Sequence, residues 1–559
     1  MRRAALLGLS AGALALFEAA CSSVEPLASL ATMEPSTTTA ATPPVQIQTH
    51  EPSAGSSGLA TATPIPPISS SSKVSGSPAG SPGLATATPL PPISPSSKVS
   101  ESPAGSPTVP AQEPLPVARQ VPLSDKRLQI GHLLRRAGFG AGPEELERFV
   151  SMGVVDTVDY LIEYEQVDDS ALELRLDGLG FDLEQLAHLQ RWALLRMIYT
   201  QRPLQEKMVL FWHGLLTSAF KKVGKGPYML NQDHLFREQA LGNYDVLLKA
   251  VSRDPAMLIW LDSRVNKKSA PNENFSRELM ELFSTGPGPY TEKDVRESAR
   301  SFTGYRLRRK VFEFDSKLHD NFSKTFLNVS GYLDGDQIID IIMNHPATGD
   351  FICTKLFSFF AYDSPDQTVI SRLASIFRSS NFSVRKVVKE ILLSPEFYSS
   401  RAYRAKIKSP PELVTGAVRS LGIEADGKQL DGLTKRMGMD LFNPFDVSGW
   451  AGGATWINST TLLQRINFAN RVSTAKSGRF SPDLKTLVQE RKISSAQEGL
   501  SYFLLVLLDD NISEEAHKIL FSFAQNLDAI EIKGAMRTLD EKLRTLLYLV
   551  LASPDYQLA

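Results

Sequence analysis

Residues 272–305 read NENFSRELMELFSTGPGPYTEKDVRESARSFTGY, a pattern that predicts two helices joined by a Gly/Pro loop. Apolar residues recur at the spacing of one buried helix face, namely Phe275, Leu279, Leu282 and Phe283. The glycine and proline residues at 286–289 end the first helix, because proline has no N–H group and glycine favours non-helical angles. Thr291 and Asp294 form a capping-box pattern, which starts the second helix.

The polar side of the first predicted helix carries the candidate catalytic carboxylates. If this side lines a cleft, Glu278 and Glu281 can act as acid/base groups or metal ligands, with Arg277 as a further catalytic candidate. Asn274, on the same side, is a candidate for ligand binding. The other interpretation is a solvent-exposed ladder in which Glu273, Arg277 and Glu281 pair at steps of four residues. Because runs of charge usually face water, spacing alone favours the ladder.

This stretch resembles the signature of an exported bacterial family known as domain of unknown function 1800 (DUF1800). Members carry Asn-Glu-Asn-Phe-x-Arg-Glu-Leu, then Tyr-Thr, Asp-Val and Thr-Gly-Trp, whereas this chain ends the signature with Tyr305. The resemblance extends from about Ile130 to the C-terminus. Its other specific parts are His132-Leu-Leu-Arg135, Phe211-Trp-His213, Pro255-Ala-Met257, His319-Asp320, His345-Pro-Ala-Thr348 and the Gly/Trp segment near residue 450. The resemblance implies an exported protein but no activity, because the family is named for lacking one.

Composition describes an ordinary soluble globular protein with extensions. The chain has 559 residues, of which 42% are hydrophobic and 22% charged. Its net charge of −1 gives no basic face, so no nucleic-acid partner is expected. The two cysteines are Cys21 and Cys353, and no internal disulfide is expected once the N-terminus is processed.

Residues 1–21 are predicted to be a bacterial signal peptide. Arg2 and Arg3 precede an apolar run, 4–17, that is too short to span a bilayer. Cys21 follows two alanines, as in a lipoprotein signal, although Glu18 stands where an apolar residue is usual. We therefore expect export to the periplasm or cell surface, with membrane attachment through a lipidated Cys21 as one alternative.

Residues 22–122 are predicted to be a disordered tether. The segment is dominated by Ser, Pro, Ala, Thr and Gly, and it contains a tandem repeat of 25 residues, Gly58–Pro82 and Gly83–Pro107. Each repeat lacks apolar side chains to bury, so a spacer is expected rather than a solenoid.

Residues 123–559 are predicted to form a large, mainly α domain with one small β-hairpin. Helical spacing recurs in segments such as 183–199, 204–220 and 335–344. Asp254-Pro255 predicts an N-cap followed by proline in the first helical position. Residues 311–329 alternate around a turn at Asp320, which predicts a hairpin that carries His319.

Histidines supply the remaining catalytic and metal candidates. His213 lies beside Phe211 and Trp212, where a histidine is more often a hydrogen-bonded core residue than a ligand. His213, His319 and Glu278 are the candidate ligands of a divalent metal, but no spacing in the chain matches a known metal motif. Within residues 123–559 there is no nucleophile elbow, phosphate loop or dinucleotide fingerprint, which argues against common hydrolases, NTPases and Rossmann dehydrogenases.

The segment 443–460, NPFDVSGWAGGATWINST, resembles a Gly/Trp block of the family. Glycines allow the backbone to turn tightly, and Trp450 and Trp456 together could form a stacking platform for sugar rings. The alternative is a buried loop in which both tryptophans fill the core. Arg465, on the following predicted helix, is a ligand-binding candidate that could reach an acidic partner such as Glu278.

These patterns leave two functions open. The first is an enzyme of the cell envelope that performs acid/base or metal-assisted chemistry on an envelope polymer. Its cleft would be lined by His213, Glu278, Glu281, His319 and Arg465. The second is a non-catalytic surface or assembly module that binds a polysaccharide or a partner protein, with the motif charges serving as structural ion pairs. The enzyme hypothesis requires the acidic and imidazole side chains to face a common cleft.

Overall fold

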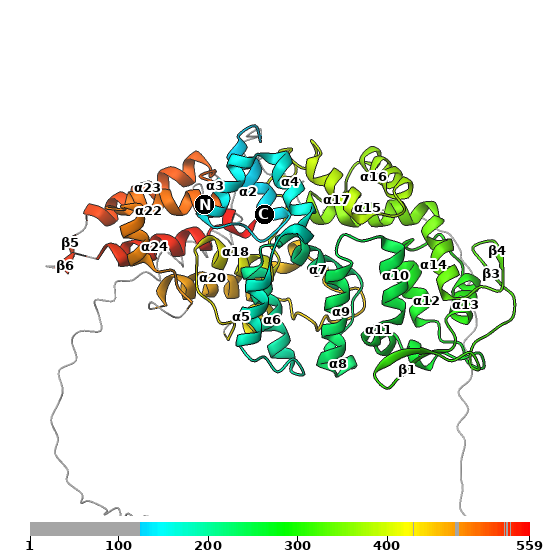
Figure 1. Ribbon diagram of the computed structural model, residues 1–559. Helices are drawn as coiled ribbons and strands as arrows, with labels where there is room; N and C mark the ends of the chain where they lie inside the picture. The colour runs from blue at the N-terminus through cyan, green and yellow to red at the C-terminus, as the bar shows by residue number, and fades with distance from the viewer. Residues whose placement is uncertain (1–122, 429, 476–479, 530, 533–534, 537) are drawn as a thin grey trace, which may run out of the picture. The chain divides into compact units, whose positions relative to one another are not determined.

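Short helices with sharply defined ends make up most of the computed structural model (Figure 1). It describes residues 123–559 except 429, 476–479, 530, 533–534 and 537, and these residues belong to one compact unit. The predicted signal peptide, Cys21 and the tether lie outside the described residues. The prediction of a mainly α fold is confirmed.

The first half of the unit is helical up to residue 301. Its helices are α2 (Lys126–Arg136), α3 (Pro143–Met152), α4 (Val154–Ile162), α5 (Ser170–Gly178), α6 (Leu186–Tyr199), α7 (Pro203–Leu215), α8 (Phe220–Val223), α9 (Gly226–Glu238), α10 (Tyr244–Arg253), α11 (Pro255–Trp260), α12 (Asn274–Glu281) and α13 (Glu292–Ser301), with 3₁₀ turns η3 (Tyr164–Gln166) and η4 (Ser263–Val265). Local signals set their ends as predicted. The Thr291–Asp294 capping box is present, and the Asp254 side chain accepts a hydrogen bond from the backbone N–H of Met257.

Short antiparallel pairs follow α13. They are β1 (Tyr305–Arg308) with β2 (Val311–Phe314) and β3 (Lys324–Phe326) with β4 (Val329–Gly331); a third pair, β5 (Glu531–Ile532) with β6 (Ala535–Met536), lies near the C-terminus. Residues 311–329 therefore belong to two hairpins rather than to the single hairpin expected from alternation. Residues 311–314 form β2 and pair with β1, the strand that precedes them in the sequence. His319 therefore lies in the loop between the two hairpins and not at the turn of a hairpin.

The second half is again helical. Its helices are α14 (Gly335–Asn344), α15 (Pro346–Phe360), α16 (Gln367–Ser379), α17 (Val384–Leu393), α18 (Pro410–Ser420), α19 (Asp431–Arg436), α20 (Ser459–Thr474), α21 (Leu484–Arg491), α22 (Ala496–Leu508), α23 (Glu514–Ala529) and α24 (Leu539–Ala552), with 3₁₀ turns η5 (Gly453–Trp456) and η6 (Asp555–Gln557). Helix α24 packs against both α20 and α22, and α18 packs against α6. None of the described helices is long and apolar enough to cross a bilayer.

The buried apolar residues form one continuous core. It runs from Ile130 on α2 to Tyr556 in η6, so residues from both ends of the unit share it. Trp212 is fully buried near its middle, with its ring stacked on that of Tyr244 at a centroid distance of 5.5 Å. Helix α2 and the C-terminal segment therefore contribute side chains to the same core.

Candidate functional site

Helix α2 sends two adjacent arginines into the interior. Arg136 donates from Nε to the Phe360 carbonyl (2.8 Å) and from Nη2 to the carbonyls of Phe359 (2.9 Å) and Ala361 (3.2 Å). It thus satisfies carbonyls at the C-terminal end of α15, where a positive charge is favourable. Arg135 pairs with Asp509, which directly follows α22, at 2.5 Å between Nη1 and Oδ2. The two arginines tie α2 to parts of the chain more than two hundred residues away.

Lys408, Glu412 and Lys207 extend this polar region to α18 and α7. Lys408 Nζ donates to the Tyr556 carbonyl (2.8 Å) and lies 3.7 Å from the centroid of the Tyr556 ring. Glu412 forms an ion pair with Lys207 and accepts a hydrogen bond from the backbone N–H of Ser409 (2.7 Å). Lys207 also donates to the Gly138 carbonyl at 2.9 Å.

Arg465, predicted as a ligand-binding residue on α20, belongs to the same region. Its side chain is 1% exposed, and its Nη2 donates to the Lys408 carbonyl at 2.8 Å. Its Nη1 donates to the side-chain oxygen of Gln557 at 3.3 Å. Among the described residues no carboxylate pairs with it, so the expected contact with Glu278 is not made.

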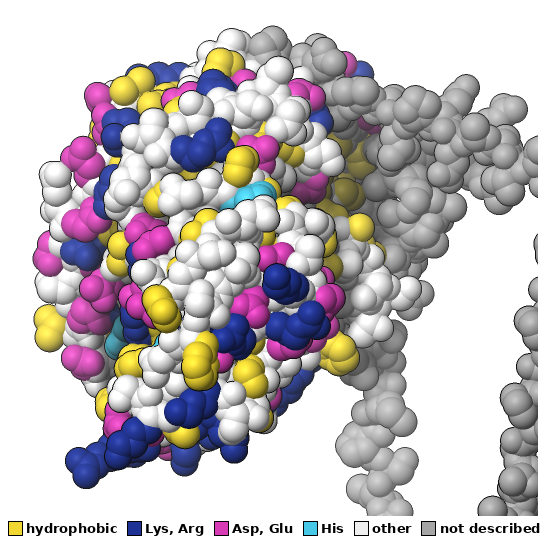
Figure 2. Space-filling view, turned by 90° about the vertical axis from the view of Figure 1, so that its right-hand side faces the viewer, with side chains coloured by type: hydrophobic (Ala, Val, Ile, Leu, Met, Phe, Trp, Pro, Cys, Tyr) yellow, Lys and Arg dark blue, Asp and Glu magenta, His cyan; other side chains and the backbone are white. Residues whose placement is uncertain are grey.

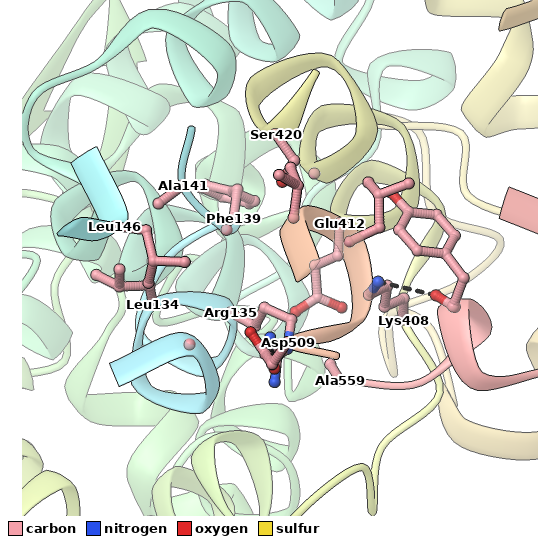
Figure 3. A pocket seen from close by; sticks show the side chains of 16 residues that line it. Leu134, Arg135, Phe139, Ala141, Leu146, Lys408, Glu412, Ser420, Asp509 and Ala559 are labelled. Atoms are coloured by element: carbon pink, nitrogen blue, oxygen red, sulfur yellow. Dashed lines mark hydrogen bonds and ion pairs between the residues drawn. The ribbon is translucent and has the colours of Figure 1, made fainter. Parts of the chain in front are cut away.

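A cavity of about 30 Å³ opens between these side chains (Figure 3). One water molecule needs roughly 10–15 Å³ by the same measure, so the space admits about two waters or a small polyatomic ion. Leu134, Phe139 and Leu146 form an apolar side of the lining. Figure 3 shows the polar residues of the lining together: Arg135, Asp509, Glu412 and Lys408, with the Lys408–Tyr556 hydrogen bond dashed.

Positive charge exceeds negative charge in the buried polar region that contains this cavity. Five cationic side chains of this region are at most 13% exposed. Arg135 and Lys408 line the cavity, whereas Arg136, Lys207 and Arg465 are buried outside its lining. The carboxylates of this region are those of Glu412 and Asp509, and both line the cavity. Burying charges without partners is costly, so an interior with this imbalance favours either loss of a proton or uptake of an anion.

The pKa values of Lys408, Arg465 and Glu412 reflect the burial of these side chains and the excess of positive charge in the region. Burial, together with the positive charges of Arg135 and Arg404, lowers the pKa of Lys408 well below its ordinary value. Burial also lowers the pKa of Arg465 to about 10. For Glu412, burial acts to raise the pKa, but Lys207 and Arg136 outweigh it and hold the pKa at about 2. Glu412 is therefore ionised at neutral pH, whereas the shift in the pKa of Lys408 favours its neutral form.

Two buried donors beside the cavity have unused hydrogen-bonding capacity. Arg135 Nη2 and Arg465 Nε are buried and find no hydrogen-bond partner among the described residues. Buried polar atoms of folded proteins are nearly always paired with protein, water or ligand. An acceptor supplied from outside the chain would meet this requirement.

His213 is a core residue. Its ring is 6% exposed, and Nε2 accepts a hydrogen bond from the backbone N–H of Phe442 at 2.9 Å. Burial lowers the pKa of His213 to about 4, so the imidazole is neutral at physiological pH. Its Nε2 lone pair is already used, which agrees with the interpretation of a hydrogen-bonded core histidine.

The Gly/Trp segment does not present two tryptophans together. Trp456 is 7% exposed and packs in the core, whereas half-buried Trp450 lies 5.3 Å from the His213 ring. Gly449 has a φ of +79°, and a side chain there would meet the Gly214 carbonyl at 2.4 Å, so the loop lies directly on the end of α7. The aromatic residue that this loop exposes is Phe445, at 85%.

The charged face of α12 is a partly exposed set of ion pairs. Arg277 pairs with Glu292 of α13 at 2.8 Å and with Glu273 at 3.3 Å. Glu281 accepts a hydrogen bond from the Tyr290 hydroxyl at 3.3 Å, while burial and the charge of Glu281 raise the pKa of Glu278. Arg277 therefore forms ion pairs on the helix surface, as the ladder interpretation expected. Its second partner is Glu292 of α13 rather than Glu281.

Replacing Arg277 with alanine should lower the free energy of unfolding by less than about 1 kcal/mol, because exposed ion pairs contribute little. Urea denaturation at low and high salt would measure this, and the small loss should shrink further in salt. A loss of several kcal/mol would show that the α12 charges have a larger role than the exposed contacts indicate.

The His319 side chain forms a local hydrogen bond. Its Nδ1 lies 2.8 Å from the Thr303 carbonyl, so the proton on Nδ1 is donated to that oxygen. The neighbouring Asp320 pairs with Arg300 at 2.8 Å. Within the part of the chain that the structure describes, no three His, Cys, Asp or Glu side chains gather in a group that could hold a metal ion. His213, His319 and Glu278 therefore do not form one metal site.

Sequence reasoning found part of the cavity and missed the rest. Arg135 lies in a motif that carried the family resemblance, and Arg465 was a candidate ligand-binding residue. Lys408, Glu412 and Asp509 were not identified. The available signal was the pair of arginines within an apolar helix, which requires buried partners but does not say where in the chain they lie.

Fold and cavity define a mainly α-helical protein with a buried, cation-rich polar site. The sequence pattern of a family described as "Protein of unknown function (DUF1800)" matches residues 132–558, and the chain belongs to this family. Both ends of the matched segment lie at the site, since His132 is on α2 and Leu558 bridges to Ile407 next to Lys408. No curated protein and no solved structure matches the chain.

Proposed function

We propose that this protein is an exported binding protein of the cell envelope that recognises a small anionic group in the cavity between α2, α18 and the C-terminal segment. The observation that carries the proposal is a cavity of about 30 Å³ lined by Arg135 and Lys408, within a buried region where cations outnumber carboxylates. A carboxylate is the favoured group, because it fits the volume and accepts several hydrogen bonds at once. Export is supported by the charged and apolar pattern of residues 1–21.

A bound anion would change the state of the residues that surround it. It would supply acceptors beside Arg135 and would favour the protonated form of Lys408, whose pKa burial and neighbouring cations lower. The apolar side formed by Leu134, Phe139 and Leu146 would exclude water and strengthen these charge-assisted contacts. The arrangement can therefore select for charge and size.

Catalysis forms no part of this proposal. The enzyme hypothesis needs a common cleft, and the candidates His213, Glu281 and Arg277 each have local partners instead. The polymer or protein partner expected from the sequence stays compatible with a binding role, if its recognised part is a carboxylate or phosphate that enters the cavity.

Thermal unfolding in acetate, phosphate and chloride at matched ionic strength tests the proposal. A ligand at one hundred times its Kd stabilises a fold by about 2.7 kcal/mol, so acetate or phosphate should raise the Tm beyond chloride, and the stronger of the two identifies the group. Lys408→Met should be about as stable as the wild type without ligand, because it removes a buried amine that has no carboxylate partner among the described residues, and it should lose the response.

Lys428→Met provides the matched control, because the Lys428 side chain is 75% exposed and does not line the cavity. This variant should keep the full response to the anion. Equal responses in the Lys408 and Lys428 variants, or no anion better than chloride, would refute anion binding at this cavity.

A further inference from the structure

Exposed apolar side chains concentrate on the two hairpins that follow α13. Phe322 is 77% exposed and Tyr332 is 79% exposed, and the same segment adds Val311, Phe314 and Val329. Scattered exposed apolar residues are normal, but a group of them marks an interaction surface. Figure 2 looks onto the end of the unit that carries β3 and β4, and it shows apolar side chains at the surface among charged side chains of both signs.

The tip of the β1–β2 hairpin has an unusual sequence for its backbone. Arg308 pairs with Val311, so Arg309 and Lys310 form a two-residue turn, with φ of +49° and +71°. Such turns strongly favour Asn-Gly, because side chains other than those of Gly, Asn and Asp are strained at positive φ. The strain is tolerated at a position where the turn presents two cations to solvent, and strained residues of this kind tend to occur at functional sites.

Most exposed cations of this segment have no ion-pair partner among the described residues. Arg308 is neutralised by Glu313 (3.1 Å) and Asp315 (2.9 Å). Among the described residues no carboxylate pairs with Arg309, Lys310, Lys317 or Lys268, all of which are exposed. The backbone N–H of Lys268 donates to the Leu318 carbonyl, which places this lysine beside the loop that joins the hairpins. We call these four cations and the five apolar residues above the hairpin patch.

We propose that the hairpin patch docks the protein on an anionic lipid surface. Aromatic side chains such as Phe322 and Tyr332 suit the boundary between headgroups and acyl chains, and cations at a hairpin tip reach lipid phosphates. The charge of the patch is complementary to such a surface. The docking is independent of the anion cavity, which lies between α2, α18 and the C-terminal segment.

Co-sedimentation with vesicles tests the docking. Full-length chains would all carry Cys21→Ser, so that no lipid on Cys21 contributes, and vesicles of phosphatidylcholine alone would be compared with equal parts of phosphatidylcholine and phosphatidylglycerol. We expect binding to the anionic vesicles that weakens with salt. The double variant R309N/K310G should bind roughly 10- to 30-fold more weakly, since each cation near an anionic surface contributes a comparable share.

R309N/K310G installs the sequence that this turn prefers, so it should not lower the Tm, and weaker binding cannot then be due to misfolding. A second double variant, F322A/Y332A, should also lose binding, whereas F445A removes an exposed aromatic residue outside the patch and should bind like the wild type. Equal binding to both vesicle types, or unchanged binding by R309N/K310G, would overturn the proposal. Binding to polygalacturonate in place of anionic vesicles would overturn it as well, because the patch would then recognise an acidic polysaccharide.

Discussion

Replacing Glu412 with alanine is expected to lower the free energy of unfolding by about 3–5 kcal/mol, the usual cost of leaving a buried charge without its partner. Glu412 is the carboxylate that pairs with Lys207, whose side chain is 1% exposed, and it faces Arg136 as well. The variant also loses the capping hydrogen bond to the Ser409 N–H. Urea denaturation at pH 7 measures the change as a shift of the midpoint.

Two comparisons isolate the cause. Glu144→Ala removes a carboxylate that is 86% exposed and pairs with Arg491, so its cost should stay below about 1 kcal/mol. Adding Lys207→Met to Glu412→Ala removes the orphaned charge, and the double variant should recover much of the lost stability. If Glu412→Ala cost no more than the surface control, the cationic interior around the cavity would not depend on this carboxylate.

Acidification is expected to destabilise the protein through His213 by about 3 kcal/mol between pH 6.5 and pH 4. Burial lowers the pKa of His213 in the fold to about 4 from an ordinary value of 6.5, so the unfolded chain binds the proton more readily in this range. The contribution of His213 to stability is therefore complete above pH 6.5 and is lost as the pH falls toward 4. Protonated Nε2 can no longer accept the hydrogen bond from Phe442.

Measuring the free energy of unfolding against pH in His213→Gln and His213→Leu tests this prediction. Asp254 acts in the opposite direction, because burial raises its pKa to about 7 and its protonation favours the fold as the pH falls. The informative quantity is thus the difference in slope between each variant and the wild type. Both variants should lack the His213 contribution, and the leucine variant should be less stable at every pH because it leaves the Phe442 N–H unpaired. Slopes equal to that of the wild type would contradict the assignment.

Local patterns predicted the helix ends well. The Thr291 capping box, the Asp254 cap and the break after α12 each depend on residues within about four positions of one another, and all three occur in the structure. The hairpins were harder to predict. Alternation of apolar residues shows that a segment is extended, but it does not show which strand the segment pairs with. Residues 311–314 pair with the strand before them, so the turn expected at Asp320 became a connecting loop.

The sequence indicated which residue types belong to candidate sites, but it did not predict where these residues lie in the fold or what they contact. Arg465 is buried next to the backbone of Lys408, and its contacts are the Lys408 carbonyl and Gln557 rather than an acidic side chain. Spacing could not show that Trp456 would fill the core while Phe445 would be exposed, since both lie in one glycine-rich loop. Which of these aromatic side chains is buried depends on how the loop packs against α7 and α19, and no local sequence pattern predicts that packing.

By itself the sequence determined the helical class, the limits of most helices, the family and the presence of arginines that require buried partners. The tertiary structure alone decided that Arg135, Lys408, Glu412 and Asp509 meet around one cavity while His213, His319 and Glu278 do not. Helix formation and capping depend on interactions within a few residues, so they are visible in the order of the amino acids. The burial and pKa of a charged side chain depend on groups hundreds of residues away, which only folding brings into contact.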